Sequence, residues 1–202
     1  MRFSILLSLF LLVNSACPAQ IHTLIGAWES GPDENHITMI VAEHYFSAAV
    51  YNKKNNTYMG TCGGAWRIEK NQFLEVHEFN TMKPDWVGVE HRSEVMLKND
   101  KLYFKTSERT EEFSMIDNGR PGELLGAWLI TGRMTDQGME KRTPGPRKTM
   151  KILSGTRFQW IAYNTETKEF FGTGGGSYTT EHGKYTENIE FFSRDNSRVG
   201  AK

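Results

Sequence analysis

The sequence predicts an all-β protein made of two tandem antiparallel units, each a small barrel or sandwich. Three observations predict this fold. The chain has 19 glycines and few apolar runs with a helical period. Short apolar or alternating runs recur about every 8–12 residues with turn-forming residues between them. Finally, a long stretch of the chain occurs twice.

The composition excludes several classes of protein. Lys and Arg total 24, Asp and Glu total 24, and the formal net charge is zero, so we expect no basic face for nucleic acid. A hydrophobic content of 38% is enough for a packed core. Two cysteines exclude a disulfide-rich scaffold. The six histidines lack metal-ligand spacing, so no metal is expected. We predict no other cofactor either.

Residues 1–19 have the features of a secretory signal peptide. Arg2 supplies the positive charge, residues 5–13 form an apolar run too short to span a bilayer, and residues 14–19 are mostly small. Cleavage after Ala19 is the favoured interpretation, and it leaves Cys62 as the sole cysteine. The alternative is lipidation at Cys17, which would anchor the protein to a membrane. Either way we expect an exported protein.

The repeat divides the rest of the chain. Residues 24–28 recur at 124–128, and residues 46–88 recur at 158–200 with 13 of 43 positions identical. A repeat of this length indicates a domain duplication. We therefore expect one unit over residues 24–117, a linker over 118–123, where turn-forming residues gather, and a second unit over 124–202.

Each unit contains runs that predict strands. In the first unit we expect strands over 38–41, 45–51 and 73–79, then a hairpin of 89–98 and 101–105 that turns at Asn99 and Asp100. In the second unit, residues 185–191 alternate, which places four side chains on one strand face: Tyr185, Glu187, Ile189 and Phe191.

Two further segments need separate interpretations. The glycine runs 60–64 and 172–176 predict strand bends, because a phosphate loop would require a following Gly-Lys-Ser/Thr. Residues 131–147 form one long loop, either a basic lid over a barrel mouth or a solvated connector.

At the repeat offset of 112 residues, Lys202 aligns with Glu90, so the second unit is expected to lack its last strands.

Two segments carry a resemblance to a known group of proteins. Gly26-Ala27-Trp28 and Gly126-Ala127-Trp128 resemble the Gly-x-Trp signature of lipocalins and the wider calycin group. Residues 157–195 are similar to a family of secreted, lipocalin-like proteins of unknown function from Gram-negative bacteria. The resemblance implies a periplasmic or extracellular protein whose barrel interior holds a small, largely apolar ligand, without enzymatic activity.

The candidate ligand-binding residues are mostly aromatic. Trp28 and Trp128 either floor a ligand cavity or plug a core. Phe158 and Trp160 share one face of a predicted strand and are expected to point inward. The predicted ligand-binding set is Trp28, Trp66, Trp128, Phe158, Trp160, Tyr178 and Glu187.

The sequence leaves other functions open. Glu75 and His77 share a strand face, and a Glu–His contact supports proton transfer, but no residue is assigned a catalytic role. A second hypothesis is a protein-interaction module that recruits a partner, or a second copy of itself, through an open sheet edge. A third is an enzyme acting on a lipid or glycan.

Overall fold

The computed structural model describes residues 24–202, and it confirms the all-β prediction. The predicted signal peptide and Cys17 lie outside the described residues. Three short 3-10 turns are the only helical segments in residues 24–202: η1 (Asp33–Asn35), η2 (Pro84–Trp86) and η3 (Asn196–Arg198). None of these turns has the length or apolar character needed to cross a membrane.

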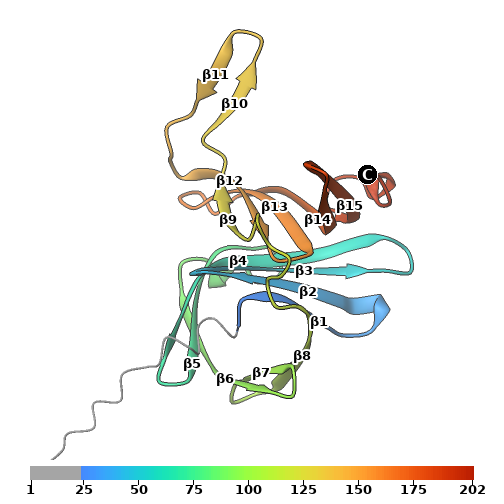
Figure 1. Ribbon diagram of the computed structural model, residues 1–202. Helices are drawn as coiled ribbons and strands as arrows, with labels where there is room; N and C mark the ends of the chain where they lie inside the picture. Colours follow the sequence, from blue (N-terminus) through green and yellow to red (C-terminus); the bar gives the residue numbers. More distant parts are fainter. Residues whose placement is uncertain (1–23) are drawn as a thin grey trace, which may run out of the picture.

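The first eight strands form a closed antiparallel barrel in chain order (Figure 1). The barrel closes because β1 pairs with both β2 and β8. The predicted hairpin is confirmed, and its turn residues Asn99 and Asp100 have φ of 53° and 58°, as a two-residue hairpin turn requires. The strands are β1 (Gly26–Ser30), β2 (His36–Ala42), β3 (Tyr45–Asn52), β4 (Thr57–Glu69), β5 (Gln72–Asn80), β6 (Glu90–Lys98), β7 (Lys101–Lys105) and β8 (Thr110–Asp117).

The second half of the chain forms an open five-stranded sheet instead of a second closed barrel. Its order is β15-β14-β13-β12-β9, and among the strands of residues 124–202 none corresponds to β6, β7 or β8. We call it the second sheet. Its strands are β9 (Gly126–Leu129), β12 (Arg147–Leu153), β13 (Arg157–Asn164), β14 (Phe170–Glu181) and β15 (Lys184–Phe192).

The expected loop at 131–147 instead contains a two-stranded hairpin. It consists of β10 (Gly132–Thr135) and β11 (Gly138–Lys141), and it stands away from the rest of the molecule (Figure 1). None of its residues lines the barrel interior.

The glycine repeat produces the same β-bulge twice. The register between β4 and β5 shifts at Gly63/Gly64, and the register between β14 and β15 shifts at Gly175/Gly176. A Cβ on Gly64 would lie 2.0 Å from the Val76 carbonyl oxygen, so a side chain there would clash with backbone. Glycine is therefore needed for the bulge.

The bulges redirect the strands that follow. At each bulge, two adjacent residues face the same side of their strand. Glu78 and Phe79 both contact Tyr163, and Glu190 and Phe191 both contact Tyr51. Phe191 thus lies on the opposite face from Ile189, packing with Tyr51 in a different cluster. The prediction that Phe191 shares a face with Ile189 is wrong, because simple alternation does not account for the extra residue.

The second sheet packs on the outer face of β2–β5, and the contacts occur in repeat-related pairs (Figure 1). The Tyr51 hydroxyl donates to Glu190, 3.1 Å away, and the Tyr163 hydroxyl donates to Glu78. The ring centroids of Tyr51 and Phe191 are 4.9 Å apart, and those of Tyr163 and Phe79 are 5.0 Å apart. The interface therefore has an approximate two-fold symmetry, as in a homodimer.

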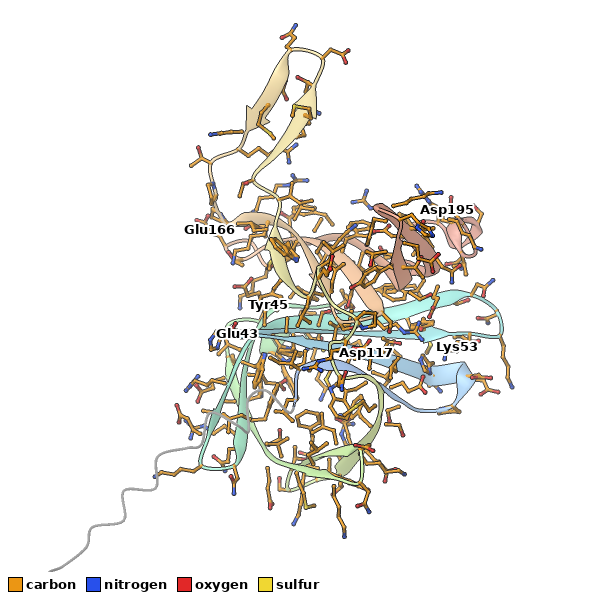
Figure 2. All side chains as sticks on the ribbon, viewed as in Figure 1. Glu43, Tyr45, Lys53, Asp117, Glu166 and Asp195 are labelled. Carbon is orange, nitrogen blue, oxygen red and sulfur yellow. The ribbon has the colours of Figure 1, made fainter. Side chains whose placement is uncertain are left out.

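A central polar contact lies between the paired ones. The Gln159 side-chain nitrogen donates to the Thr61 hydroxyl at 2.8 Å and to the Thr173 hydroxyl at 3.0 Å, and these two threonines are themselves repeat-related. Tyr45, at the boundary in Figure 2, makes a 2.7 Å hydroxyl–hydroxyl contact with Tyr163. The identities of the repeat thus include many residues that join the barrel to the second sheet.

Candidate functional site

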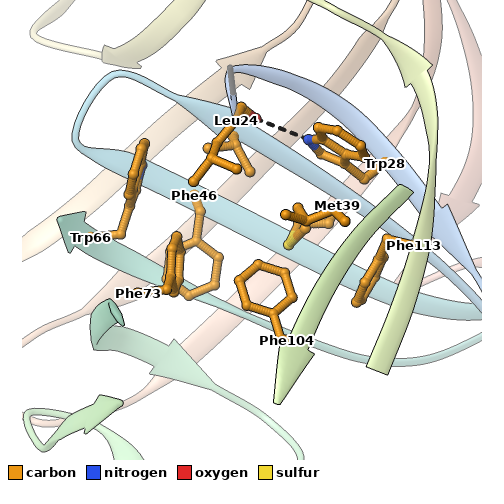
Figure 3. Packing of buried hydrophobic residues seen from close by; sticks show 10 residues of the cluster. Leu24, Trp28, Met39, Phe46, Trp66, Phe73, Phe104 and Phe113 are labelled. Carbon is orange, nitrogen blue, oxygen red and sulfur yellow. Dashed lines mark hydrogen bonds between the residues drawn. The ribbon is translucent and has the colours of Figure 1, made fainter. Parts of the chain in front are cut away.

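The floor of the barrel is a packed aromatic cluster (Figure 3). Trp28 is fully buried, and its indole N–H donates to the Leu24 carbonyl at 2.9 Å. Trp66 stacks on Phe73 with ring centroids 5.2 Å apart and donates to the Ala42 carbonyl at 2.8 Å. Both indole N–H groups are satisfied by backbone, and neither tryptophan is among the residues that line the cavity next to this cluster.

That cavity has a volume of about 470 Å³, within the range of about 300–1,000 Å³ typical of small-molecule sites. Its wall is mostly apolar, because most of the residues that β2–β4, β5, β7 and β8 direct into it have apolar side chains. These are Ile37, Met39, Phe46, Ala48, Val50, Cys62, Phe73, Phe104 and Phe113.

Polar groups gather at one end of the cavity, where β5, η2 and β6 meet. Glu75 and His77 lie there on β5, as their shared strand face predicts, and the His77 Nε2 atom is 3.3 Å from the Glu75 Oε1 atom. His91 on β6 completes the group, with its ring centroid 5.8 Å from that of His77. We call Glu75, His77 and His91 the polar end.

The hydrogen bonds around Asn80 determine the tautomer of His77. The Asn80 side-chain oxygen accepts from the backbone N–H groups of Met82 and Lys83 at 3.0 and 2.7 Å. The amide nitrogen therefore faces His77 Nδ1, 2.8 Å away, and an amide NH₂ can only donate. Because Nδ1 is thus an acceptor, the ring proton of His77 lies on Nε2, the atom next to Glu75.

Both imidazoles keep an unused nitrogen at the cavity. Among the described residues, neither His77 Nε2 nor His91 Nε2 has a hydrogen-bond partner, although both atoms are buried. The His91 ring stacks on Trp86 with centroids 3.8 Å apart. Burial lowers the pKa of His91, and its electrostatic interactions with His77 and Lys83 lower it further, against the opposing effect of Glu75.

The cations at the rim of the cavity are already engaged. Arg92 donates to Glu90, and Arg109 forms an ion pair with Glu111 at 2.7 Å. The Lys83 ammonium lies 4.0 Å from the centroid of the Trp86 ring. The cavity therefore presents aromatic surface and the polar end rather than a free cationic cluster.

Cys62 is on the cavity wall, and it forms no disulfide within residues 24–202. Burial raises its pKa to about 12, and the carboxylates of Glu75 and Glu111 act in the same direction. A nucleophilic cysteine needs the opposite shift, because the thiolate is the reactive form. The thiol therefore serves as part of the apolar wall.

The predicted ligand-binding residues are divided between two places. Trp28 and Trp66 are in the barrel floor, whereas the other five lie in the second sheet and none of them lines the barrel cavity. Those five are Trp128, Phe158, Trp160, Tyr178 and Glu187.

In the second sheet, Phe158, Tyr178 and the half-buried Trp160 belong to one apolar cluster. They lie on the face away from the β1–β8 barrel. Phe158 and Trp160 share this face, as strand alternation predicts, but the sheet that carries them is open, so they do not point into a second closed barrel. Glu187 contacts Lys151 and accepts from the Tyr185 hydroxyl at 2.7 Å.

Sequence reasoning missed His91, which belongs to the polar end, and two residues that contact this group: Asn80 beside His77 and Trp86 beside His91. The shared face of Glu75 and His77 was the one available signal, since the pairing of β5 with β6 is not visible in the pattern. In residues 24–202 no group of three or more His, Cys, Asp or Glu residues is placed to hold a metal ion. Comparisons with protein-family models, with curated proteins and with solved structures gave no match.

Proposed function

We propose that this protein is an exported, lipocalin-like binding protein that holds a small, largely apolar molecule inside the β1–β8 barrel. The observation that carries the proposal is the cavity of about 470 Å³, walled by aromatic and aliphatic side chains with polar groups at one end. The signal-like residues 1–19 and the two Gly-x-Trp segments support export and the lipocalin likeness.

The binding energy comes mainly from removing apolar ligand surface from water. Each Å² of such surface contributes about 25 cal/mol, and rings such as Phe46, Phe73 and Phe104 supply the opposing wall. The floor cluster is closely packed, so the ligand occupies the space above Trp28 and Trp66 without displacing them.

Tryptophan fluorescence tests this proposal, because Trp86 lines the cavity and Trp128 does not. We expect titration with fatty alcohols, fatty acids, retinoids or haem to change the emission of the unmodified protein. Trp86→Phe should lose most of that change, whereas Trp128→Phe should keep it.

A cavity-filling variant provides the complementary test. Ala48 lines the cavity, and Trp160 occupies the repeat-equivalent position in the second sheet. Ala48→Trp should therefore fill the space and weaken binding about tenfold or more, which corresponds to about 1.4 kcal/mol. If no probe binds the folded protein, or if Ala48→Trp binds equally well, the proposal is wrong.

A second candidate function uses the free edge of β9. Within residues 24–202, β9 pairs only with β12, while its counterpart β1 also pairs with β8. Large apolar side chains at and after this edge are exposed, including Trp128 at 54% and Ile130 at 46%. In the barrel, β8 pairs antiparallel with β1 at the equivalent edge. The occupant of the β9 edge would therefore be an antiparallel strand of another protein, with apolar and polar residues alternating as they do in β8.

A synthetic peptide with the sequence of residues 110–117 tests the second candidate. Binding at the β9 edge, measured by isothermal calorimetry, should be lost for a peptide with Ser114→Pro, because proline removes a backbone donor. Equal binding of both peptides, or of neither, contradicts strand addition. Light scattering of the protein alone separates self-association from recruitment of a different partner.

A further inference from the structure

We infer that the polar end of the barrel cavity selects a neutral hydroxyl group, so that the preferred ligand is a long-chain alcohol rather than an acid or an amine. This inference rests on the proposed function, and it goes further by assigning the head group. The geometry that carries it is a buried N–H donor and a carboxylate oxygen only 3.3 Å apart, on His77 and Glu75.

The two groups differ in what they offer a ligand. His77 offers the Nε2 proton, because its Nδ1 atom accepts from Asn80. Glu75 offers its carboxylate oxygens. Its side chain is 23% exposed and lines the cavity. The His77 side chain is 3% exposed, and its Nε2 atom has no hydrogen-bond partner among the described residues. An unsatisfied buried donor is costly, so a ligand acceptor placed there gains a hydrogen bond at no loss.

A single hydroxyl group can accept from His77 and donate to Glu75 at the same time. Its oxygen accepts from His77 Nε2–H, and its proton is donated to Glu75 Oε1. The Nε2 atom of His91 is a second unused partner on the same side of the cavity. The aromatic wall then accommodates the alkyl chain.

Charged head groups fit the same place less well. A carboxylate would satisfy His77 but would lie against the Glu75 carboxylate, and two like charges at hydrogen-bond distance repel strongly. The arginines at the rim offer little compensation, because Arg92 and Arg109 are held by Glu90 and Glu111. An ammonium group would satisfy Glu75 but would face the N–H of His77, which cannot accept from it.

A series of ten-carbon probes tests the inference on the unmodified protein. Decan-1-ol, decanoate, decylamine and decane share one chain length and differ only in the head group. At pH 7.5 we expect decan-1-ol to bind at least about tenfold more tightly than the other three in isothermal calorimetry, a difference of about 1.4 kcal/mol. Preference for decanoate or decylamine, or equal affinity for all four, overturns the inference while leaving the proposed cavity function in place.

Two variants assign the selectivity to the polar end. Glu75→Gln removes the negative charge and keeps the size, so decanoate should approach decan-1-ol in affinity. His77→Phe removes the donor, so decan-1-ol should bind no more tightly than decane. Selectivity unchanged in both folded variants overturns the inference. If none of the four probes binds the unmodified protein, the proposed function itself fails and the head-group inference fails with it.

Discussion

At the residue scale, the repeat provides a matched pair of tryptophans in different surroundings. Trp28 and Trp128 make the same hydrogen bond, each at 2.9 Å to the carbonyl four residues earlier. Trp28 is 0% exposed, whereas Trp128 is 54% exposed. The local sequence fixes the indole orientation in both places, and the strands that close the barrel decide whether the ring is buried.

This pair gives a direct stability prediction. Trp28→Ala should lower the free energy of unfolding by about 3–5 kcal/mol, because it removes a fully buried aromatic ring. Trp128→Ala should cost less than half as much, because about half of its surface already meets solvent. Urea denaturation of the two variants measures the difference, and equal losses would contradict the assigned burial.

Histidine titration gives a second prediction at this scale. Burial lowers the pKa of His36, Lys53 lowers it further, and Glu29 partly opposes them; the pKa of His91 is also lowered. The unfolded chain, with ordinary histidine pKa values of about 6.5, then binds more protons than the folded protein just below that pH. Stability should therefore fall as the pH drops through about 6.5 towards the lower pKa of the folded state.

The measurement is urea denaturation at pH 7.5 and at pH 5.5. We expect His36→Gln to show a smaller loss between these pH values than the unmodified protein. A variant that loses as much stability as the unmodified protein would exclude His36 as a source of the pH dependence.

At the element scale, the end of β8 is fixed to the second sheet through one carboxylate. Asp117, labelled in Figure 2, accepts from the hydroxyls of Ser154 and Thr156 at 2.8 and 2.6 Å. It also accepts from the backbone N–H groups of Gly119, Gly155 and Thr156 at 2.9–3.0 Å. This carboxylate joins the barrel, the following linker and the β12–β13 turn.

Replacing that carboxylate should be costly. Asp117→Asn keeps the size but puts an NH₂ group against several donors, so we expect a loss of about 3 kcal/mol in the free energy of unfolding. The exposed Asp136→Asn, in the β10–β11 turn, serves as the control and should change stability little. A loss for Asp117→Asn no larger than for the control would contradict this role.

The strands themselves were largely predictable from the sequence. The 112-residue offset that relates Tyr51 to Tyr163 also relates β3 to β13 and β5 to β15 at both ends of each strand. The glycine runs predicted bends at the places where the bulges occur, but the change of face was not predictable, since simple alternation places Glu78 and Phe79 on opposite faces of the strand. Without the bulges, the repeated residues could not be recognised as an interface.

The candidate site was predictable only in part. The face shared by Glu75 and His77 follows from strand alternation, but His91 reaches them through the pairing of β5 with β6. Five of the seven predicted ligand-binding residues lie in the second sheet and not at the cavity. The sequence shows a Gly-x-Trp strand in both halves of the chain, but it does not show that the first half alone encloses a space.

At the scale of the whole molecule, the barrel and the second sheet behave as two related parts joined by an approximately symmetric interface. Apolar clusters, the two tyrosine–glutamate contacts and Gln159 all connect them. We therefore expect a single cooperative unfolding transition in urea. Far-UV circular dichroism and tryptophan fluorescence should give coincident curves, and two separated transitions would contradict the coupling.

The most direct test of the central claim is to locate a bound ligand in the folded protein. With decan-1-ol added to isotope-labelled protein, two-dimensional ¹H–¹⁵N spectra should show shifts at amides of β3, β5 and β6 and at the Trp86 indole N–H. The signals of β13–β15 that face away from the barrel should stay unchanged. Shifts confined to the second sheet, or none at saturating alcohol, would contradict ligand binding inside the barrel.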